Sequence, residues 1–232
     1  MSTLRGVFLD LDTLDCSDID LDPLREVLDE FVPHGATPVD VIAARLANAE
    51  VAITNKMKFN AALLARLDRL KLICLAATGT DNVDCDAAAE RGIAVANIKD
   101  YCTAAVAQHV FALALALTVH LGEYRALVRS GAWQKSGQFN LLNFPIRELA
   151  GMTFGVIGYG KLGRAAARIA AAFDMRVLIA ERRGQPPRDG RVPFEEVLAE
   201  SDVLSLHSPL TPETRGLVGA AEFARMKPDA IL

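Results

Sequence analysis

Short apolar segments alternate with longer amphipathic segments along residues 1–98. The apolar segments, at 6–9, 51–54, 72–76 and 93–97, are typical of buried strands. The segments between them, at 23–31, 39–49, 60–70 and 85–91, have the periodicity of helices. Strands that are joined through helices make crossover connections and therefore form a parallel sheet. The pattern predicts an α/β fold in which residues 1–98 form one doubly wound layer.

A long helical segment follows at 103–130. Alanine and leucine fill most of its first half, which is typical of a helix packed on several sides. Its most apolar stretch, 110–119, is much shorter than the roughly 20 residues that a membrane-spanning helix needs, so we expect a buried helix and no membrane association. The polar loop at 131–145, which carries Trp133, is expected to cross between two lobes.

A second alternating unit begins at residue 153. Strands are expected at 153–157, 177–180 and 203–206, and helices at 162–173, 194–200 and 220–226. Ala230 opens another apolar run after Pro228 and Asp229, as a new strand would begin. The pattern predicts a second doubly wound parallel sheet within 99–232, and we expect it to be incomplete because Leu232 falls inside this last strand.

The glycine pattern GYGKLG at 158–163 lies between a predicted strand and a predicted helix. Gly158 allows a tight turn, Gly160 leaves room for a pyrophosphate, and Gly163 lets the helix pack close to the strand. The free N–H groups and the dipole at the start of a helix attract phosphate. In this strand–turn–helix context the motif predicts a dinucleotide-binding site.

The second strand of this unit ends in Glu181, followed directly by Arg182 and Arg183. A carboxylate at this place can accept hydrogen bonds from the ribose hydroxyls of NAD. Guanidinium groups suit the extra 2′-phosphate of NADP instead. The two signals leave NAD and NADP both open.

Composition and charge narrow the functional class. The chain has 232 residues, of which 51% are apolar and 23% charged, with a formal net charge of −4. These values are unlike those of disordered chains and of nucleic-acid-binding proteins, so we expect no nucleic-acid partner. No secretory signal is visible at the start, and the four cysteines form no CxxC pair, which favours buried, reduced thiols in a cytoplasmic protein. The four histidines have no spacing typical of ligands, so no metal site is predicted.

Five segments together resemble one family, the D-isomer-specific 2-hydroxyacid dehydrogenases, in its glycerate dehydrogenase/hydroxypyruvate reductase branch. The resemblance is carried by AATGTDNVD at 76–84, YCTAAVAQHV at 101–110, SGAWQKSGQF at 130–139, ELAGMTFGVIGYGKLG at 148–163 and LHSPLTPETRGLV at 206–218. It implies two lobes. Residues 1–98 would form a flavodoxin-like substrate domain, and 99–232 an incomplete Rossmann-type NAD(P)-binding domain that includes the linking helix at about 103–130.

The resemblance also implies where ligands bind. The loop Thr78, Gly79 and Thr80 matches the family's substrate loop, in which backbone N–H groups bind the substrate carboxylate. Lys56 could add positive charge nearby, although it fits a solvated lysine equally well. The positions that the motif and the resemblance together assign to the cofactor are Thr103, Val106, Gly158, Tyr159, Gly160, Lys161, Leu162, Gly163, Glu181, Arg182, Arg183, His207, Ser208 and Pro209.

Among these, Val106 also fits a core valine, and His207 is expected on the adenosine side of the cofactor, not as the acid–base catalyst. Trp133 is expected to pack at the crossover. The family's catalytic arginine, glutamate and histidine would all lie beyond Leu232, so no catalytic residue is assigned within the chain. We therefore expect reduced cofactor affinity and weak or no turnover from these 232 residues alone.

The function implied by the resemblance is hydride transfer between NAD(P)H and C2 of a small 2-keto or 2-hydroxy acid. Hydroxypyruvate/D-glycerate and glyoxylate/glycolate are the expected pairs, and the complete protein is expected to be a homodimer. One alternative is a non-catalytic protein of the same fold that senses NAD(P). Another is a phosphoglycerate-type or formate dehydrogenase, for which Lys56 and Lys58 would supply basic residues.

Overall fold

The computed structural model describes residues 3–14 and 17–232, so Cys16 lies outside the described residues. The chain divides into two compact units, Met1–Tyr101 and Cys102–Leu232. The division falls close to the boundary predicted at 98. Each unit has its own sheet and its own buried core.

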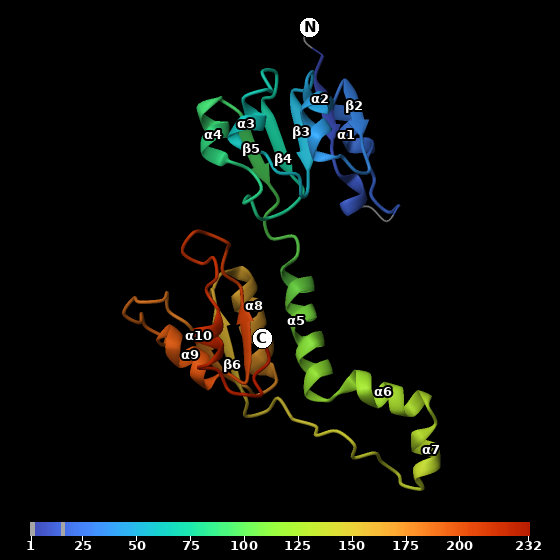
Figure 1. The fold of residues 1–232 in the computed structure, drawn as a ribbon, viewed down its shortest axis with the longest axis vertical. Coiled ribbons are helices and arrows are strands. Elements are labelled where there is room, and N and C mark those ends of the chain that lie inside the picture. The colour runs from blue at the N-terminus through green and yellow to red at the C-terminus, as the bar shows by residue number, and fades with distance from the viewer. Residues whose placement is uncertain (1–2, 15–16) are drawn as a thin grey trace. The chain divides into compact units, whose positions relative to one another are not determined.

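The first unit contains one sheet of five parallel strands, arranged in the order β2-β1-β3-β4-β5 (Figure 1). This is the doubly wound order of flavodoxin-like folds. The strands are β1 (Arg5–Phe8), β2 (Glu30–Pro33), β3 (Val51–Thr54), β4 (Leu72–Leu75) and β5 (Ala94–Asn97). Its helices are η1 (Leu11–Thr13), α1 (Asp22–Val27), η2 (Val39–Val41), α2 (Ile42–Leu46), α3 (Ala61–Leu64) and α4 (Cys85–Glu90). The predicted α/β fold with parallel strands is confirmed.

The helix predicted at 23–31 is wrong in its second half. It ends at Val27, because Leu28 has extended backbone angles (φ −108°, ψ 127°). The chain then pairs with β1 as the edge strand β2, with Phe31 opposite Gly6. This strand is only half-buried, so it lacks the continuous apolar run by which the other strands were predicted.

The second unit contains three parallel strands in the order β7-β6-β8: β6 (Thr153–Ile157), β7 (Arg176–Ile179) and β8 (Val203–Leu206). Single parallel bridges extend the sheet on both sides, from Ala180 to Val192 and from Val203 to Ile231. The resulting order, Val192, β7, β6, β8, Ile231, is that of a Rossmann-type sheet. The bridge at Ile231 lies within the apolar run at which a strand was predicted to begin. The order reverses between β6 and β8, where ligands bind in folds of this kind.

The helix predicted over 103–130 is two helices, α5 (Thr103–Thr118) and α6 (Leu121–Arg129), which meet at a bend of 60°. The chain turns at His120, whose backbone is left-handed (φ 51°). The loop predicted at 131–145 contains a further helix, α7 (Ala132–Ser136). Within the described residues, no single helix is long and apolar enough to cross a membrane, and only the bent pair α5 and α6 together has the length and composition to do so.

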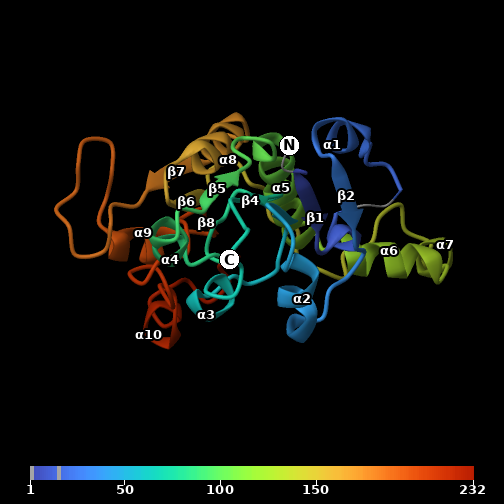
Figure 2. The ribbon, with the colours of Figure 1, turned by 90° about the horizontal axis from the view of Figure 1, so that it is seen from above.

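The remaining helices of this unit are α8 (Lys161–Ala172), α9 (Phe194–Glu200) and α10 (Ala220–Phe223). Helices α5 and α8 lie side by side (Figure 2). The Phe111 ring on α5 stacks on Phe154 of β6 at a centroid distance of 5.4 Å and on Phe173 at 5.6 Å. This packing joins α5 to the start of β6 and to the last turn of α8.

The cysteines differ from the prediction of buried thiols. Cys85 is exposed at the start of α4, and Cys74 and Cys102 are half-buried. All three are free thiols. Burial raises the pKa of the Cys74 thiol, which keeps it protonated.

Candidate functional site

The turn after β6 is built around Gly158, whose φ is +93°. A Cβ atom there would lie 2.5 Å from the Ser208 nitrogen and 2.6 Å from the His207 carbonyl carbon. Both the backbone angle and the space therefore require glycine. The contact also shows that the glycine turn and the segment after β8 touch at the point where the strand order reverses.

Gly163 and Gly160 meet different surroundings. A Cβ atom at Gly163 would lie 2.1 Å from the Gly158 carbonyl oxygen, so only glycine lets α8 pack this close to the turn. A Cβ atom at Gly160 would have no described atom within 4 Å, apart from its own chain neighbours. Gly160 is the N-cap of α8 and cannot cap it with a side chain. The helix start therefore opens onto free space, which is the arrangement that binds phosphate.

The other residues of the turn lie around this opening. Tyr159 is half-buried against the core of the unit, and its carbonyl oxygen accepts a hydrogen bond from Arg164 Nη1 at 3.2 Å. Lys161 is exposed at the first position of α8, and Leu162 is half-buried beside it. The chain places these residues together at the carboxyl edge of the sheet, as the motif predicts.

The segment after β8 lines the same edge. The His207 N–H donates to the Ile157 carbonyl at 2.7 Å, which ties this segment to the end of β6. His207 Nε2 lies 3.0 Å from Ser205 Oγ, and partial burial lowers the pKa of the imidazole, so it is neutral at pH 7. Ser208 is half-buried and Pro209 is exposed next to it.

Glu181 lies just past the end of β7 and is buried, with 3% of its surface exposed. Arg188 donates to both carboxylate oxygens, through Nε to Oε2 at 2.6 Å and through Nη2 to Oε1 at 2.7 Å. The Arg182 N–H donates to Oε1 at 2.8 Å. These bonds, led by the Arg188 pair, lower the pKa of Glu181 to about 2. The carboxylate predicted to bind ribose is thus already bonded within the protein.

The two arginines after Glu181 differ in their environment. Arg183 Nη2 lies 2.7 Å from Glu222 Oε1, and its guanidinium lies 5.6 Å from the centre of the Phe194 ring. The Arg182 side chain is exposed, and none of the acids that the structure describes forms an ion pair with it. Only Arg182 of this pair is therefore available to a ligand.

Thr103 and Val106 lie on the first turn of α5, the helix that opens the second unit. Both side chains are half-buried, so Val106 is not a fully buried core valine. The Val106 N–H donates to the Cys102 carbonyl at 2.9 Å, as in an ordinary first helical turn. Every residue predicted to contact the cofactor lies in this second unit.

The predicted substrate residues lie in the first unit, at the carboxyl edge of its sheet. Thr78, Gly79 and Thr80 form an exposed loop after β4, and Asn97 Nδ2 donates to the Thr78 carbonyl at 2.7 Å. The backbone N–H groups of the three loop residues have no acceptor within the described chain. Unpaired N–H groups in an exposed turn can bind a carboxylate.

Lys56 follows the neighbouring strand β3 at the same edge, since β3 and β4 are parallel. Its backbone N–H donates to Asp10 Oδ2 at 2.6 Å, and the Asn55 N–H donates to Asp10 Oδ1 at 2.9 Å. Asp10 is itself 1% exposed. This buried carboxylate holds the turn after β3 in place, and the Lys56 side chain is exposed.

Two residues of the site were missed from the sequence, Asp10 and Arg188. Asp10 ends the apolar run VFLD, a place where polar residues gather in parallel sheets. Arg188 belongs to a polar stretch at 184–191 that carries no recognisable motif. Its pairing with Glu181 depends on how this loop folds back, which the local pattern does not encode.

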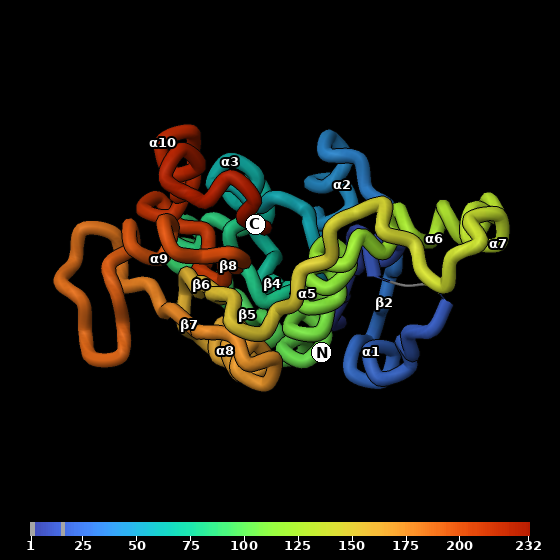
Figure 3. Tube along the Cα trace, turned by 90° about the horizontal axis from the view of Figure 1, so that it is seen from below, coloured from blue at the N-terminus to red at the C-terminus, as the bar shows by residue number. Residues whose placement is uncertain are grey.

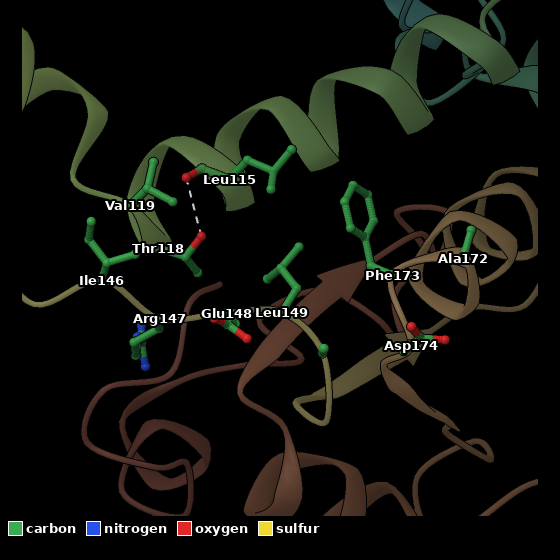
Figure 4. Close-up of a pocket in the computed structure, with 11 residues that line it drawn as sticks. Leu115, Thr118, Val119, Ile146, Arg147, Glu148, Leu149, Ala172, Phe173 and Asp174 are labelled. Carbon is green, nitrogen blue, oxygen red and sulfur yellow. Dashed lines mark hydrogen bonds between the residues drawn. The ribbon is translucent and has the colours of Figure 1, made fainter.

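A separate apolar hollow of about 420 Å³ lies elsewhere in the second unit (Figure 4). It is lined by the last turn of α5 near Leu115 and Thr118, by residues 146–150, and by Phe173 and Asp174 after α8. The glycine turn is at the other end of α8, so this hollow is not part of the cofactor site. Among the described residues there is no group of three His, Cys, Asp or Glu side chains that could hold a metal ion.

The second unit thus combines a Rossmann-type sheet with an open helix start at its switch point. These features define a protein that binds a dinucleotide. Residues 111–232 match the family described as "D-isomer specific 2-hydroxyacid dehydrogenase, NAD binding domain". The chain belongs to the D-isomer-specific 2-hydroxyacid dehydrogenase family, whose members are NAD(P)-dependent oxidoreductases of hydroxy acids. The predicted family, fold class and cofactor class are confirmed.

Known proteins resemble the chain over nearly its whole length. It is 42% identical to the glycerate dehydrogenase of Methylorubrum extorquens, with 99% of the chain and 71% of the relative aligned. It is 34% identical to the hydroxypyruvate reductase of Blautia hydrogenotrophica, with 99% and 73% aligned. The solved structure of D-lactate dehydrogenase from Aquifex aeolicus with NAD and lactic acid superposes with a TM-score of 0.80 at 29% identity, covering 96% of the chain and 66% of that protein.

Proposed function

We propose that the protein transfers a hydride between NAD(P)H and C2 of a small 2-keto or 2-hydroxy acid. Hydroxypyruvate/D-glycerate is the first candidate pair, and glyoxylate/glycolate is the second. The names of the two similar proteins, a glycerate dehydrogenase and a hydroxypyruvate reductase, support this choice. The observation that carries the proposal is the open start of α8 beside Gly160, at the switch point of the second sheet.

The chain's own residues would bind and orient the cofactor. The first N–H groups of α8 would bind the pyrophosphate across Gly160. The His207–Ser208 segment would line the adenosine side, and Thr103 and Val106 would contact the pyrophosphate and nicotinamide from α5. When bound, the nicotinamide supplies the hydride chemistry.

The first unit would hold the acid. The unpaired N–H groups of Thr78, Gly79 and Thr80 would bind the substrate carboxylate, with the Lys56 ammonium adding positive charge. Asp10 would act as a positioning residue, because it bonds the backbone that carries Lys56. When these donors hold the carboxylate of the substrate, its position fixes that of C2, the adjacent carbon that is reduced.

The reaction is tested by following the oxidation of NADH and of NADPH by the full-length protein in the presence of hydroxypyruvate, glyoxylate or phosphohydroxypyruvate. We expect turnover with the first two acids and weaker turnover with the phosphorylated one. Lys56→Met should raise KM for the acid and leave the Kd of the cofactor unchanged, because Lys56 lies in the other unit. No turnover with any of these acids and either cofactor would contradict the proposal. Tight cofactor binding without turnover would instead favour a sensing protein.

We also propose that the protein is a homodimer. Several large apolar side chains of α5, α6 and the loop around α7 are exposed, which is unusual for a surface that meets only water. They are Leu113, Leu117, Leu121, Val128, Trp133, Phe139 and Leu142. Trp133 is held in this surface by a hydrogen bond from Nε1 to the Phe139 carbonyl at 3.1 Å. A second copy of the chain would cover these side chains.

A further inference from the structure

The segment between β7 and α9 is a long loop that extends away from the sheet (Figure 3). Its two ends are tied together, because the Glu181 N–H donates to the Val192 carbonyl and the Val192 N–H donates to the Ile179 carbonyl, both at 2.9 Å. Arg188 therefore returns to the end of β7, seven residues after Glu181. The loop presents one arginine directly to the acid at the predicted adenosine end of the site.

The contact between Arg188 and Glu181 is bidentate. Two guanidinium nitrogens bond the two carboxylate oxygens at 2.6 and 2.7 Å, in the parallel geometry that makes such pairs strong. The Glu181 side chain is 2% exposed and the Arg188 side chain is 62% exposed. Arg188 thus covers the carboxylate from the solvent side, and a ribose hydroxyl can reach it only if Arg188 moves.

The neighbouring arginines are not equivalent to Arg188. Arg183 is occupied by Glu222. Arg191 lies farther from the acid than Arg188 does, at 3.8 Å from Glu181 Oε1, and it donates a hydrogen bond to the Ala180 carbonyl at 3.3 Å. Arg182 is exposed and has no ion-pair partner in the part of the chain that the structure describes. Arg188 neutralises the charge of Glu181, so the exposed guanidinium of Arg182 leaves a net positive charge at the predicted adenosine end of the site.

We propose that Arg188 determines the choice of cofactor by clamping Glu181, and that the chain therefore prefers NADP(H) to NAD(H). An unclamped carboxylate would accept hydrogen bonds from the ribose 2′- and 3′-hydroxyls and repel a 2′-phosphate. The clamped carboxylate does neither, and Arg182 and the exposed face of Arg188 offer donors to the phosphate. This inference rests on the proposed function, since it concerns the cofactor of that reaction.

The test measures the Kd of NAD⁺ and of NADP⁺ by titration calorimetry, with no reaction required. The wild-type chain should bind NADP⁺ more tightly. Arg188→Met exposes the Glu181 carboxylate, and it should shift the ratio of the two Kd values toward NAD⁺ by about tenfold or more. Glu181→Gln removes the acid and frees Arg188, so it should shift the ratio further toward NADP⁺. If Arg188→Met does not fold, as judged by circular dichroism, Glu181→Gln still provides the test.

Arg176→Met is the matched control. Arg176 also pairs with a glutamate, Glu200, but lies at the opposite end of β7. This variant should leave the ratio unchanged. The inference is overturned if the wild-type chain prefers NAD⁺, or if the variants of Arg188 and Glu181 bind both dinucleotides in the wild-type ratio. If the wild-type chain binds neither dinucleotide, the proposed function fails together with the inference.

Discussion

Three glycines in the turn after β6 have separate tasks, which the atoms around each of them define. Gly158 adopts a backbone angle that other residues avoid, Gly163 makes room for a carbonyl oxygen, and Gly160 borders open space. The spacing of the motif predicted all three tasks from the sequence, because each depends on local strand–turn–helix geometry. Only Gly160 is free of structural constraints from described atoms, so we propose that its role is in binding.

The first prediction compares Gly163→Ala with Gly160→Ala. The new methyl group at 163 would lie 2.1 Å from the Gly158 carbonyl oxygen, so α8 must move, at a cost of about 1–3 kcal/mol in the free energy of unfolding. The methyl group at 160 meets no described atom and should leave that free energy within about 0.5 kcal/mol of wild type. Urea denaturation measures both, and equal stability of the two variants would contradict the packing described for α8.

The second prediction concerns acid stability through Glu181. Its pKa is lowered from 4.5 to about 2, chiefly by Arg188, so its ionised form stabilises the folded state above pH 4.5. That contribution is lost as the pH falls from 4.5 toward 2. Wild type should therefore lose more unfolding free energy over this range than Glu181→Gln, as measured by urea denaturation at a series of pH values. Parallel pH dependences of the two proteins would contradict the clamp.

The contacts of Asp10 and Arg188 could not be predicted from the sequence. Both act through partners that are distant along the chain or reached through an irregular loop. A motif records which residues are present at a fixed spacing, whereas these contacts depend on how β3 lies beside β1 and how the loop at 182–191 folds back.

At the scale of elements, buried strands were predicted better than edges and bends. Strands β3, β6 and β8 have the predicted bounds. Strands of a parallel sheet are buried on both faces, so a short, mostly apolar segment marks where each one begins and ends. Strand β2 was missed since its four residues, EFVP, do not form a continuous apolar run. The bend at His120 was missed because neither proline nor glycine occupies the turning residue, whose backbone is left-handed.

The third prediction concerns the junction of β1 and β3. Asp10→Ala leaves the buried N–H of Asn55 and that of Lys56 without an acceptor, which should cost about 1–3 kcal/mol and speed amide hydrogen exchange at both residues. Asp29→Ala is the control, because Asp29 also accepts a backbone N–H, from Leu4, but in an exposed place. Unchanged exchange at residues 55 and 56 would show that Asp10 does not hold this turn.

At the scale of the whole molecule, each unit has candidate functional residues where its strand order reverses. In the first unit this place is the Asp10–Lys56 contact between β1 and β3, and in the second it is the Gly158–Ser208 contact between β6 and β8. The parallel order that creates both places was predictable from the alternation of strands and helices. The exposed apolar surface of α5 and α6 could not be predicted from that alternation, and the homodimer was expected from the family resemblance alone.

The fourth prediction concerns assembly. If a second copy covers the exposed face of α5 and α6, the wild-type protein sediments as a dimer. Leu117→Glu combined with Val128→Glu places charges in that contact and should yield a folded monomer, because both side chains are exposed in the single chain. Sedimentation velocity measures both proteins, and a monomeric wild type would contradict the proposed dimer.

The binding of NADPH and NADH to the 232-residue chain tests the central claim most directly. Wild type should bind at least one of them, and Gly160→Val should weaken that binding by about tenfold or more, because its side chain occupies the space in front of α8. Ala171→Val, an exposed change at the other end of α8, should bind as wild type does. Failure of the wild-type chain to bind either cofactor, or undiminished binding by a folded Gly160→Val variant, would contradict the account.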